Sequence, residues 1–313
     1  MSAISAGDST VASTKSSRKK PARSDRTKAQ RKLGMMLVAP AVIVMILVTL
    51  YPIINAFVLS LQRADLRFPQ ANQFIGLDNY GSVLSSSLWW ADVGHTLIIT
   101  VVSVTFELVL GMLVALSMHR VIFARGAVRA VALIPYGIVT VVAAYSWRYA
   151  LELDSGWIPK LLGLGSDPLA SRNGSYIGVI VSEIWKTTPF MALLLLGGLA
   201  LVPDELHEAA RVDGASTWQR FWKITIPLMK PAILVALLFR TLDAVRIYDS
   251  VVIFNNGAHS TETVSVLASN QLLNRLNLGL GSTVSVLLFV LVGIIAFIFI
   301  KLFGANSGPG GGN

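Results

Sequence analysis

Hydrophobic positions along the chain form six long stretches that carry few charges. Lys32 and Arg63 bracket 30 uncharged residues near the start, and Arg275 and Lys301 bracket 25 near the end. A helix needs about 20 apolar residues to cross a bilayer, so this pattern predicts membrane-spanning helices. We expect the six spans at about residues 33–62, 95–118, 130–147, 176–202, 231–254 and 276–300.

The composition supports a membrane protein and excludes several other classes. Of the 313 residues, 54% are hydrophobic and 14% are charged, and the mean hydropathy is +0.65. Soluble domains carry about a quarter charged residues. A soluble globule, a disordered chain and a nucleic-acid-binding domain are therefore excluded, and the predicted fold class is an all-α polytopic membrane protein.

The basic residues predict the orientation of the spans. Nine of the 26 Lys and Arg residues fall in residues 1–32, which we expect to be a disordered cytoplasmic tail. With the N-terminus inside, the inner segments hold 17 basic residues and the outer segments six. Because cytoplasmic loops are enriched in Lys and Arg, both termini are predicted to be cytoplasmic. The membrane domain is predicted over residues 33–303, followed by a disordered tail at 304–313.

Residues that would support catalysis or metal binding do not form recognisable motifs. The chain has no cysteine, its four histidines are far apart, and no glycine is followed by lysine, so it has no phosphate-binding P-loop. We expect no catalytic residue, no metal site and no bound cofactor. If the protein uses ATP, another chain must bind it.

The cytoplasmic loop at residues 203–231 has clear local signals for two short helices. Asp204 is placed to cap the first helix, and Gly214 is a natural left-handed stop. Ser216 and Gln219 have the spacing of a capping box. Pro227 and Pro231 are expected to end the second helix and redirect the chain into the fifth span. By these residues alone, the loop is an amphipathic elbow on the membrane surface.

The same loop resembles the cytoplasmic signature of ABC importer permeases. The matching pattern is Glu208-Ala-Ala-x-x-Asp-Gly-Ala, then Phe221, then Ile-x-Ile-Pro227, with Ile226 in place of the usual Leu. The resemblance implies that this segment is the coupling helix, which sits in a cleft of a partner ATPase. The residues that it assigns to coupling are Glu208, Ala209, Ala210, Asp213, Gly214, Ala215, Phe221 and Pro227.

Further motifs, at residues 74–80 and 185–190, resemble the carbohydrate-uptake branch, and residues 134–142 and 239–244 are most similar to permeases of trehalose importers. The resemblance implies an inner-membrane permease subunit for trehalose. Its implied partners are a second homologous permease, two cytoplasmic ATPases that use ATP and Mg, an extracytoplasmic binding protein and membrane lipids, with no nucleic acid. The alternatives are import of another sugar or of glycerol phosphate, and a self-contained secondary transporter.

Charged residues inside the predicted spans are candidates for the substrate path, because charges in hydrocarbon are costly. Glu183 and Lys186 are three residues apart on the fourth span, and Pro189 frees a backbone carbonyl beside them. This group forms either a sugar site or an internal salt bridge. The candidate path residues are Glu183, Trp185, Lys186, Thr188, Arg240, Asp243 and Tyr248.

The fifth span has charges at successive steps of three, at Arg240, Asp243, Arg246 and Asp249. Each neighbouring pair is close enough to bond, which predicts a self-satisfied ladder. The alternative is a pore lining or a contact with the partner permease. Glu107 is alone in the second span, where we expect a packed structural carboxyl.

Overall fold

The computed structural model describes residues 25–120, 125–163, 165–258 and 261–304. These residues are mostly helical, and the only strands among them are β1 (Gln62–Arg63) and β2 (Gln73–Phe74). The all-α prediction is confirmed. Of the disordered tails predicted at residues 1–32 and 304–313, residues 1–24 and 305–313 lie outside the described residues. The first helix already begins at Asp25, and the last ends at Gly304, so residues 25–32 and 304 are helical.

Among the described residues, five helices are long and apolar enough to cross a membrane, and a bent helix pair makes a sixth if it is counted as one span. The spans lie at Lys32–Ser60, Ser87–Arg120, Arg172–Leu199, Thr217–Ala244 and Leu278–Lys301. The helices concerned are α1 (Asp25–Ser60), α3 (Ser87–Arg120), α7 (Arg172–Leu199), α10 (Ile226–Ala244) and α13 (Leu278–Gly304). This agrees with the predicted multi-span fold.

The third predicted span is not one straight helix. α4 (Arg125–Gly137) and α5 (Thr140–Leu151) are bent by 82° relative to each other. Pro135 lies inside α4 and has no N–H to donate, and glycine at 137 is a poor helix former. Helical hydrogen bonding therefore weakens just before the bend, which the apolar length of the segment did not reveal.

The fifth span begins earlier than predicted, because Pro227 does not end a helix. α9 (Thr217–Arg220), the π-helical turn η3 (Phe221–Thr225) and α10 follow one another without a break. In η3 the Ile226 N–H donates to the Phe221 carbonyl, five residues back. Pro227 follows directly, at the second residue of α10, so the π-helical turn lies immediately before the residue that has no N–H to donate.

The fifth span also ends earlier than the predicted residue 254. The Arg246 N–H donates to the Asp243 carbonyl, and the Ile247 N–H donates to the Ala244 carbonyl, each at 3.1 Å. These three-residue steps tighten the backbone and end the α-helix. A separate helix, α11 (Asp249–Asn255), follows.

Two units make up the chain, and their boundary lies within α1, after Ile54. In the first unit, residues 33–54 expose apolar side chains around the helix. A helix that is hydrophobic on all sides is typical of a membrane span. The second unit runs from Asn55 and holds the remaining elements.

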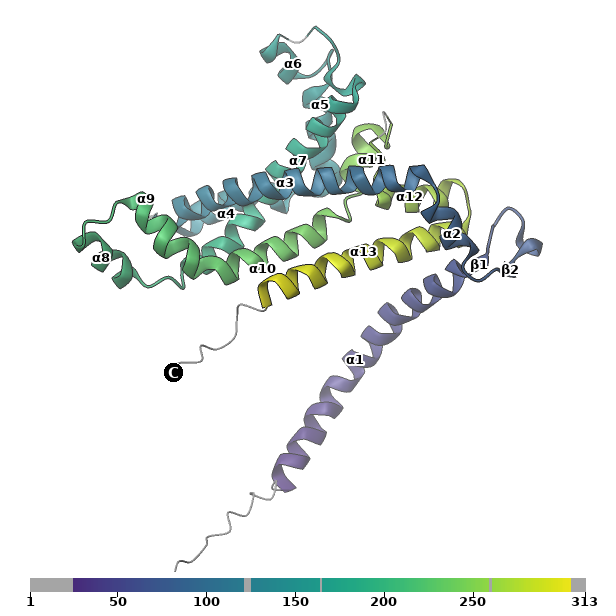
Figure 1. Ribbon diagram of the computed structural model, residues 1–313, viewed down its shortest axis with the longest axis horizontal. Coiled ribbons are helices and arrows are strands. Elements are labelled where there is room, and N and C mark those ends of the chain that lie inside the picture. The colour runs from purple at the N-terminus through teal and green to yellow at the C-terminus, as the bar shows by residue number, and fades with distance from the viewer. Residues whose placement is uncertain (1–24, 121–124, 164, 259–260, 305–313) are drawn as a thin grey trace, which may run out of the picture. The chain divides into compact units, whose positions relative to one another are not determined.

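The core of the second unit lies between α3, α7 and α10, which run side by side (Figure 1). Met112, Met191 and Met229, one from each helix, are buried there. Gly198 allows α7 to approach α10 closely, because a Cβ at this position would collide with Ala232. Small residues at helix interfaces are common in membranes for this reason.

A second cluster packs α5, α7 and α11 together around Phe254. Gly178 of α7 gives that ring room, since a Cβ there would lie 2.7 Å from Phe254 Cε1. The remaining short elements are α2 (Asp78–Leu84), α6 (Trp157–Leu162), α8 (Asp204–Val212), α12 (Val264–Ser269), the 3-10 turns Pro69–Ala71 and Pro168–Ala170, and the π-helical turn Asn270–Asn274.

Asn79 on α2 fixes the end of α1 to the rest of the second unit. Its side-chain amide donates to the carbonyls of Ser60 at 2.9 Å and Gln62 at 2.8 Å. The hydroxyls of Ser60 and Tyr80 are 2.7 Å apart, and the Thr283 hydroxyl on α13 also donates to the Ser60 carbonyl. Two of these bonds satisfy the Ser60 carbonyl, which the end of α1 leaves without a helical partner.

The close approach of α7 to α10 gives a test of the packing. Gly198→Ala is expected to lower the thermal unfolding midpoint, because overpacking a well-filled interface costs about 1–3 kcal/mol. Gly197→Ala is the matched control, since a Cβ there meets nothing within 4 Å. Thermal unfolding of the purified variants in detergent measures both, and equal midpoints would contradict the packing of these helices.

Candidate functional site

The loop between α7 and α10 folds as two short helices joined by a tight turn. α8 begins at Asp204, but Pro203 occupies the N-cap position and no side chain caps the helix. The prediction that Asp204 is the cap was therefore wrong. Asp204 and Glu205 instead lie in the first turn, where negative charge favours the helix dipole.

The turn after α8 is a Schellman motif. Gly214 has a φ of +80°, the Ala215 N–H donates to the Ala210 carbonyl at 2.8 Å, and the Gly214 N–H donates to the Arg211 carbonyl at 3.1 Å. The predicted left-handed stop is thus confirmed. The predicted capping box is confirmed as well, since Ser216 and Gln219 each accept the other's backbone N–H.

The outer surface of this loop is available to a partner. Glu208, Ala209, Asp213, Gly214 and Pro227 are exposed, whereas Ala210, Ala215 and Phe221 are half-buried. Three aromatic rings gather next to this surface, with centroids 5.3–6.1 Å apart, at Trp218, Phe221 and Trp222. Trp218 is 69% exposed and Trp222 51%. Exposed apolar area of this kind marks interaction sites.

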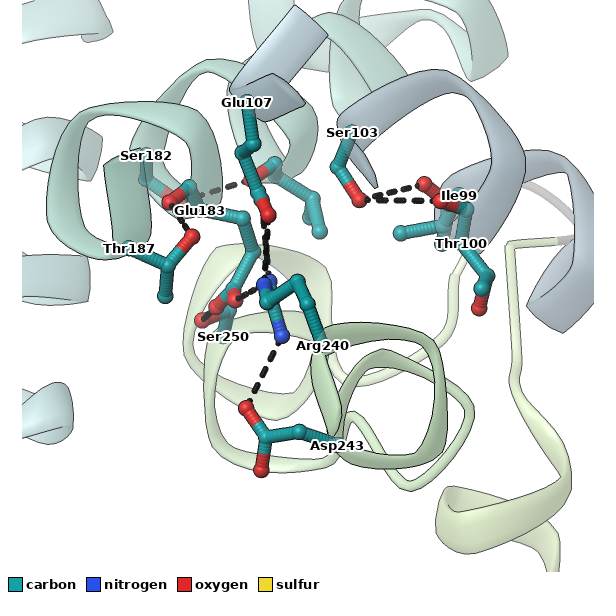
Figure 2. Close-up of polar contacts among 11 residues, drawn as sticks. Ile99, Thr100, Ser103, Glu107, Ser182, Glu183, Thr187, Arg240, Asp243 and Ser250 are labelled. Atoms are coloured by element: carbon teal, nitrogen blue, oxygen red, sulfur yellow. Dashed lines mark hydrogen bonds and ion pairs between the residues drawn. The ribbon is translucent and has the colours of Figure 1, made fainter. Parts of the chain in front are cut away.

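A network of ion pairs lies inside the second unit, where α3, α7 and α10 meet (Figure 2). Arg240 donates to both carboxylate oxygens of Glu107, with distances of 2.5 and 3.0 Å. It also donates to Glu183 at 3.1 Å and to Asp243 at 2.8 Å. The Ser250 hydroxyl of α11 donates to the second oxygen of Glu183 at 2.5 Å. We call these five residues the Arg240 cluster.

Burial divides the Arg240 cluster into an inner part and an outer part. The side chains of Arg240 and Glu107 are 1% and 0% exposed, and that of Glu183 is 9% exposed. The Asp243 side chain is 67% exposed. Buried charges in a membrane protein pair with one another, and the inner part obeys this rule with a bidentate contact. The outer carboxylate is open to a ligand.

The structure identifies partners that the sequence did not name for these charges. Glu107, the single charge of the predicted second span, is the packed structural carboxyl that we expected, and it holds Arg240 through two bonds. Glu183 forms an internal salt bridge, one of its two alternatives, with Arg240 as the partner, and it also accepts from Ser250. Pairing between positions 107 and 240 arises from the packing of distant segments, so the local spacing rules could not reveal it. The Ser250 contact was likewise missed.

The predicted charge ladder along the fifth span is present only at its first step. Arg240 and Asp243 pair, but Arg246 makes no ion pair within the described residues and donates to the Leu242 carbonyl. The helix ends at Ala244, so positions 246 and 249 no longer follow the helical spacing. The ladder fails because the helix that would carry it stops too early.

A cavity of about 420 Å³ opens beside the Arg240 cluster. Its volume lies in the range of small-molecule sites, about 300–1,000 Å³. Three acidic residues, three basic residues and five residues with hydroxyl groups line it, together with Ile247. The acidic residues are Glu183, Asp243 and Asp249, and the basic ones are Lys186, Arg240 and Arg246. The hydroxyl groups belong to Tyr136, Thr140, Thr187, Tyr248 and Ser250. Lys186 Nζ lies 5.5 Å from the centre of the Tyr136 ring.

Five of the seven predicted path residues line this cavity, and Trp185 and Thr188 do not. The Trp185 ring packs edge-on against Trp147, with centroids 6.0 Å apart. The Thr188 hydroxyl is buried and has no hydrogen-bond partner within the described residues. Neither residue therefore contributes to the lining of this cavity.

No described group of three or more His, Cys, Asp or Glu residues is placed to hold a metal ion. His259, one of the four histidines, lies outside the described residues. The carboxylates of the Arg240 cluster are engaged by a guanidinium, so the arrangement suits hydrogen bonding to a polar solute.

The ion pairs of the Arg240 cluster should dominate the stability of the second unit. Arg240→Met is expected to destabilise the protein by about 3–5 kcal/mol, because it leaves Glu107 and Glu183 buried without their charge partner. Arg246→Met is the control, since Arg246 is exposed and bonds only a carbonyl. Thermal unfolding in detergent checks this, with Glu107→Gln added to Arg240→Met as a rescue. A stable Arg240→Met protein would contradict the role assigned to the cluster.

Comparison with known proteins identifies the family to which this chain belongs. Residues 81–306 match the family described as binding-protein-dependent transport system inner membrane component. The chain is 54% identical to the trehalose transport system permease protein SugA of Mycobacterium tuberculosis over 283 residues, which cover 90% of this chain and 92% of that protein. It is 37% identical to the trehalose/maltose transport system permease protein MalF of Thermococcus litoralis, covering 87% and 94% of the two chains.

The fold is also similar to solved structures. A chain of a bacterial ABC transporter involved in the import of the polysaccharide alginate superposes with a TM-score of 0.77 at 22% identity, covering 91% of this chain and 99% of that one. All these relatives are transport proteins, in agreement with the prediction of a transport subunit and not an enzyme. The chain belongs to the binding-protein-dependent transport system inner membrane components, the multi-pass permease subunits of ABC importers.

Proposed function

We propose that this protein is the permease subunit of an ATP-driven importer that takes up trehalose. The observation that carries the proposal is the 54% identity, over 90% of the chain, to a permease named for trehalose transport. The relative at 37% identity is named for trehalose and maltose. The chain itself does no covalent chemistry in this proposal, and a partner ATPase hydrolyses ATP with Mg.

The coupling surface of the proposal is the loop formed by α8, its turn and α9. Its exposed face carries Glu208, Ala209, Asp213 and Gly214 in a conformation held by the Schellman motif and the capping box. A preorganised loop loses little conformational entropy on binding. The small Ala209 and the aromatic rings beside it suit a cleft in a partner protein.

In the proposed orientation, this loop, both termini and the basic segment before α1 lie in the cytoplasm. The excess of Lys and Arg in these segments supports it. The short helix α6, the β1–β2 hairpin and α12 then face outside, where an extracytoplasmic binding protein delivers the sugar. Two ATPases and a second homologous permease complete the complex.

The cavity beside the Arg240 cluster is the proposed substrate path within this chain. An uncharged disaccharide leaving water needs replacement hydrogen bonds, because an unpaired buried hydroxyl costs a few kcal/mol. Asp243 and Tyr248 are partly exposed and offer an acceptor and a ring face. The buried side of the cluster keeps Asp243 in place through Arg240.

Co-purification separates this proposal from the secondary-transporter alternative. A tagged chain expressed with its natural neighbours should bring down an ATPase, a second permease and a binding protein. Uptake of labelled trehalose by the same cells should stop when the chain is deleted. Isolation of the chain alone, with uptake that persists without ATP, would favour a self-contained transporter.

Charge reversal on the coupling surface should stop transport without unfolding the protein. Glu208→Lys is expected to abolish trehalose uptake at a normal protein level, because the side chain is exposed and the new charge prevents seating of the loop in the ATPase. Asp154→Lys, an exposed charge reversal between α5 and α6, is the control and should leave uptake unchanged. Normal uptake by Glu208→Lys would remove this loop from the coupling mechanism.

Reporter fusions test the orientation. A reporter that is active only in the cytoplasm should be active after Lys301 and inactive between residues 69 and 92. The positive-inside distribution gives this expectation. Measured reporter activity, normalised to protein level, decides it, and the reverse pattern would overturn the placement of the coupling loop.

Substitution in the cavity tests the substrate path. Asp243→Ala is expected to raise the apparent KM for trehalose about tenfold, since a hydrogen bond to a charged group contributes about 1.5–3 kcal/mol. Trp185→Ala, which does not change the lining of the cavity, should leave KM unchanged. Uptake kinetics at matched protein level measure both. A raised KM for Trp185→Ala alone would move the path away from this cavity.

A further inference from the structure

A second cavity, of about 660 Å³, lies between the coupling loop and the adjoining ends of α3 and α7. Its walls come from α8, α9 and η3 on one side, and from Leu113, Leu116 and Leu199 on the other. It adjoins the C-terminal end of α7, where Leu199 lines it. This cavity is separate from the one beside the Arg240 cluster and is not needed for the proposed substrate path.

Arg220 brings an unsatisfied guanidinium to this cavity. Its Nη2 donates to the Thr217 hydroxyl at 3.2 Å, and its Nη1 lies 3.5 Å from the His207 carbonyl. Its Nε is buried and has no acceptor within the described residues. A guanidinium has five N–H donors, so several remain for a ligand. A buried donor left unpaired is costly, and an anion would satisfy it.

The other charges around the cavity also favour an anion. Arg120 and Arg211 line it with Arg220, against a single acidic lining residue, Asp204. None of these three arginines forms an ion pair within the described residues. His119 and His207 line the cavity too. The resulting positive field attracts a doubly or singly charged phosphate group.

The rest of the lining points to a ligand with an apolar part. Leu113 and Leu116 belong to the spanning helix α3, and Leu199 ends the spanning helix α7. A basic pocket between helix ends at the membrane surface is typical of sites for anionic lipid head groups. A soluble phosphate would use the arginines and leave the leucine wall empty.

We propose that this cavity binds one anionic phospholipid, with the phosphate held by Arg211 and Arg220 and the acyl chains along Leu113 and Leu116. The lipid would bridge the coupling loop and α3 by direct contacts. The leucine side of the cavity belongs to the spanning helices α3 and α7, so this side is the membrane end. Lipid binding does not depend on which sugar the importer carries.

Native mass spectrometry of the intact transporter complex tests the site. Phosphatidylglycerol and phosphatidylcholine with identical acyl chains are added in turn to the complex in mild detergent. Phosphatidylglycerol should be retained preferentially. Arg211→Gln and Arg220→Gln should each reduce that retention about tenfold, the loss expected for a hydrogen bond to a charged group. Lys223→Gln removes an exposed basic residue of η3 that does not line the cavity, and should retain the lipid.

Three outcomes would overturn the proposal. They are equal retention of the two lipids, unchanged retention in both arginine variants, and displacement of the lipid by glycerol 1-phosphate at equal concentration. The last result would assign the site to a soluble phosphate ester. Arg211 lies on the exposed face of α8, so its variant keeps the test valid if Arg220→Gln fails to fold. Because retention is measured without transport, failure here leaves the proposed transport function standing.

Discussion

The buried guanidinium of Arg240 is the interaction on which the rest of the structure depends. An unpaired charge at this depth would be too costly for a membrane-spanning helix. Two bonds to Glu107 and one to Glu183 compensate it. These contacts can form only when α3, α7 and α10 bring their polar positions to the same depth. Ser250 extends the constraint to α11, so one charge fixes four helices.

Both proposed functional surfaces are attached to the helix that carries this charge. Residues 217–244 are continuous from the proposed coupling loop through η3 and α10. Arg220 borders the proposed lipid cavity and Arg240 borders the proposed substrate cavity, about 30 Å apart by helical rise. The π-helical turn preserves this continuity past Pro227. If the loop couples as proposed, its displacement has a direct route along this helix to the Arg240 cluster.

Local features of the structure could be predicted from the sequence, and contacts between distant segments could not. The spans, the left-handed Gly214 and the capping box at Ser216 depend on neighbouring residues, and the sequence contains those signals. The bidentate pair of Glu107 and Arg240 joins positions 133 residues apart. Glu183 accepts one bond from Arg240, which is 57 residues further along the chain, so the spacing of charges within one span could not reveal that partner.

Breaks in helices were the other source of error. Proline predicted a stop at position 227, where a π-helical turn absorbs it, while the bend after Pro135 was missed. A proline removes one helical hydrogen bond in both places, but the residue alone does not say whether the helix bends or continues through a π-helical turn. For the motif at residues 74–80, in contrast, the structure gives a physical reason for a pattern that the sequence offered only as a family resemblance. Asn79 and Tyr80 of this motif fix the end of α1.

Stimulation of ATP hydrolysis tests the central claim most directly. The transporter complex is reconstituted in lipid with its binding protein, and ATPase activity is measured with a panel of disaccharides. The account predicts strong stimulation by the binding protein loaded with trehalose, and little by the binding protein alone. Absence of stimulation by trehalose, with a clear response to another solute in the panel, would contradict the assignment.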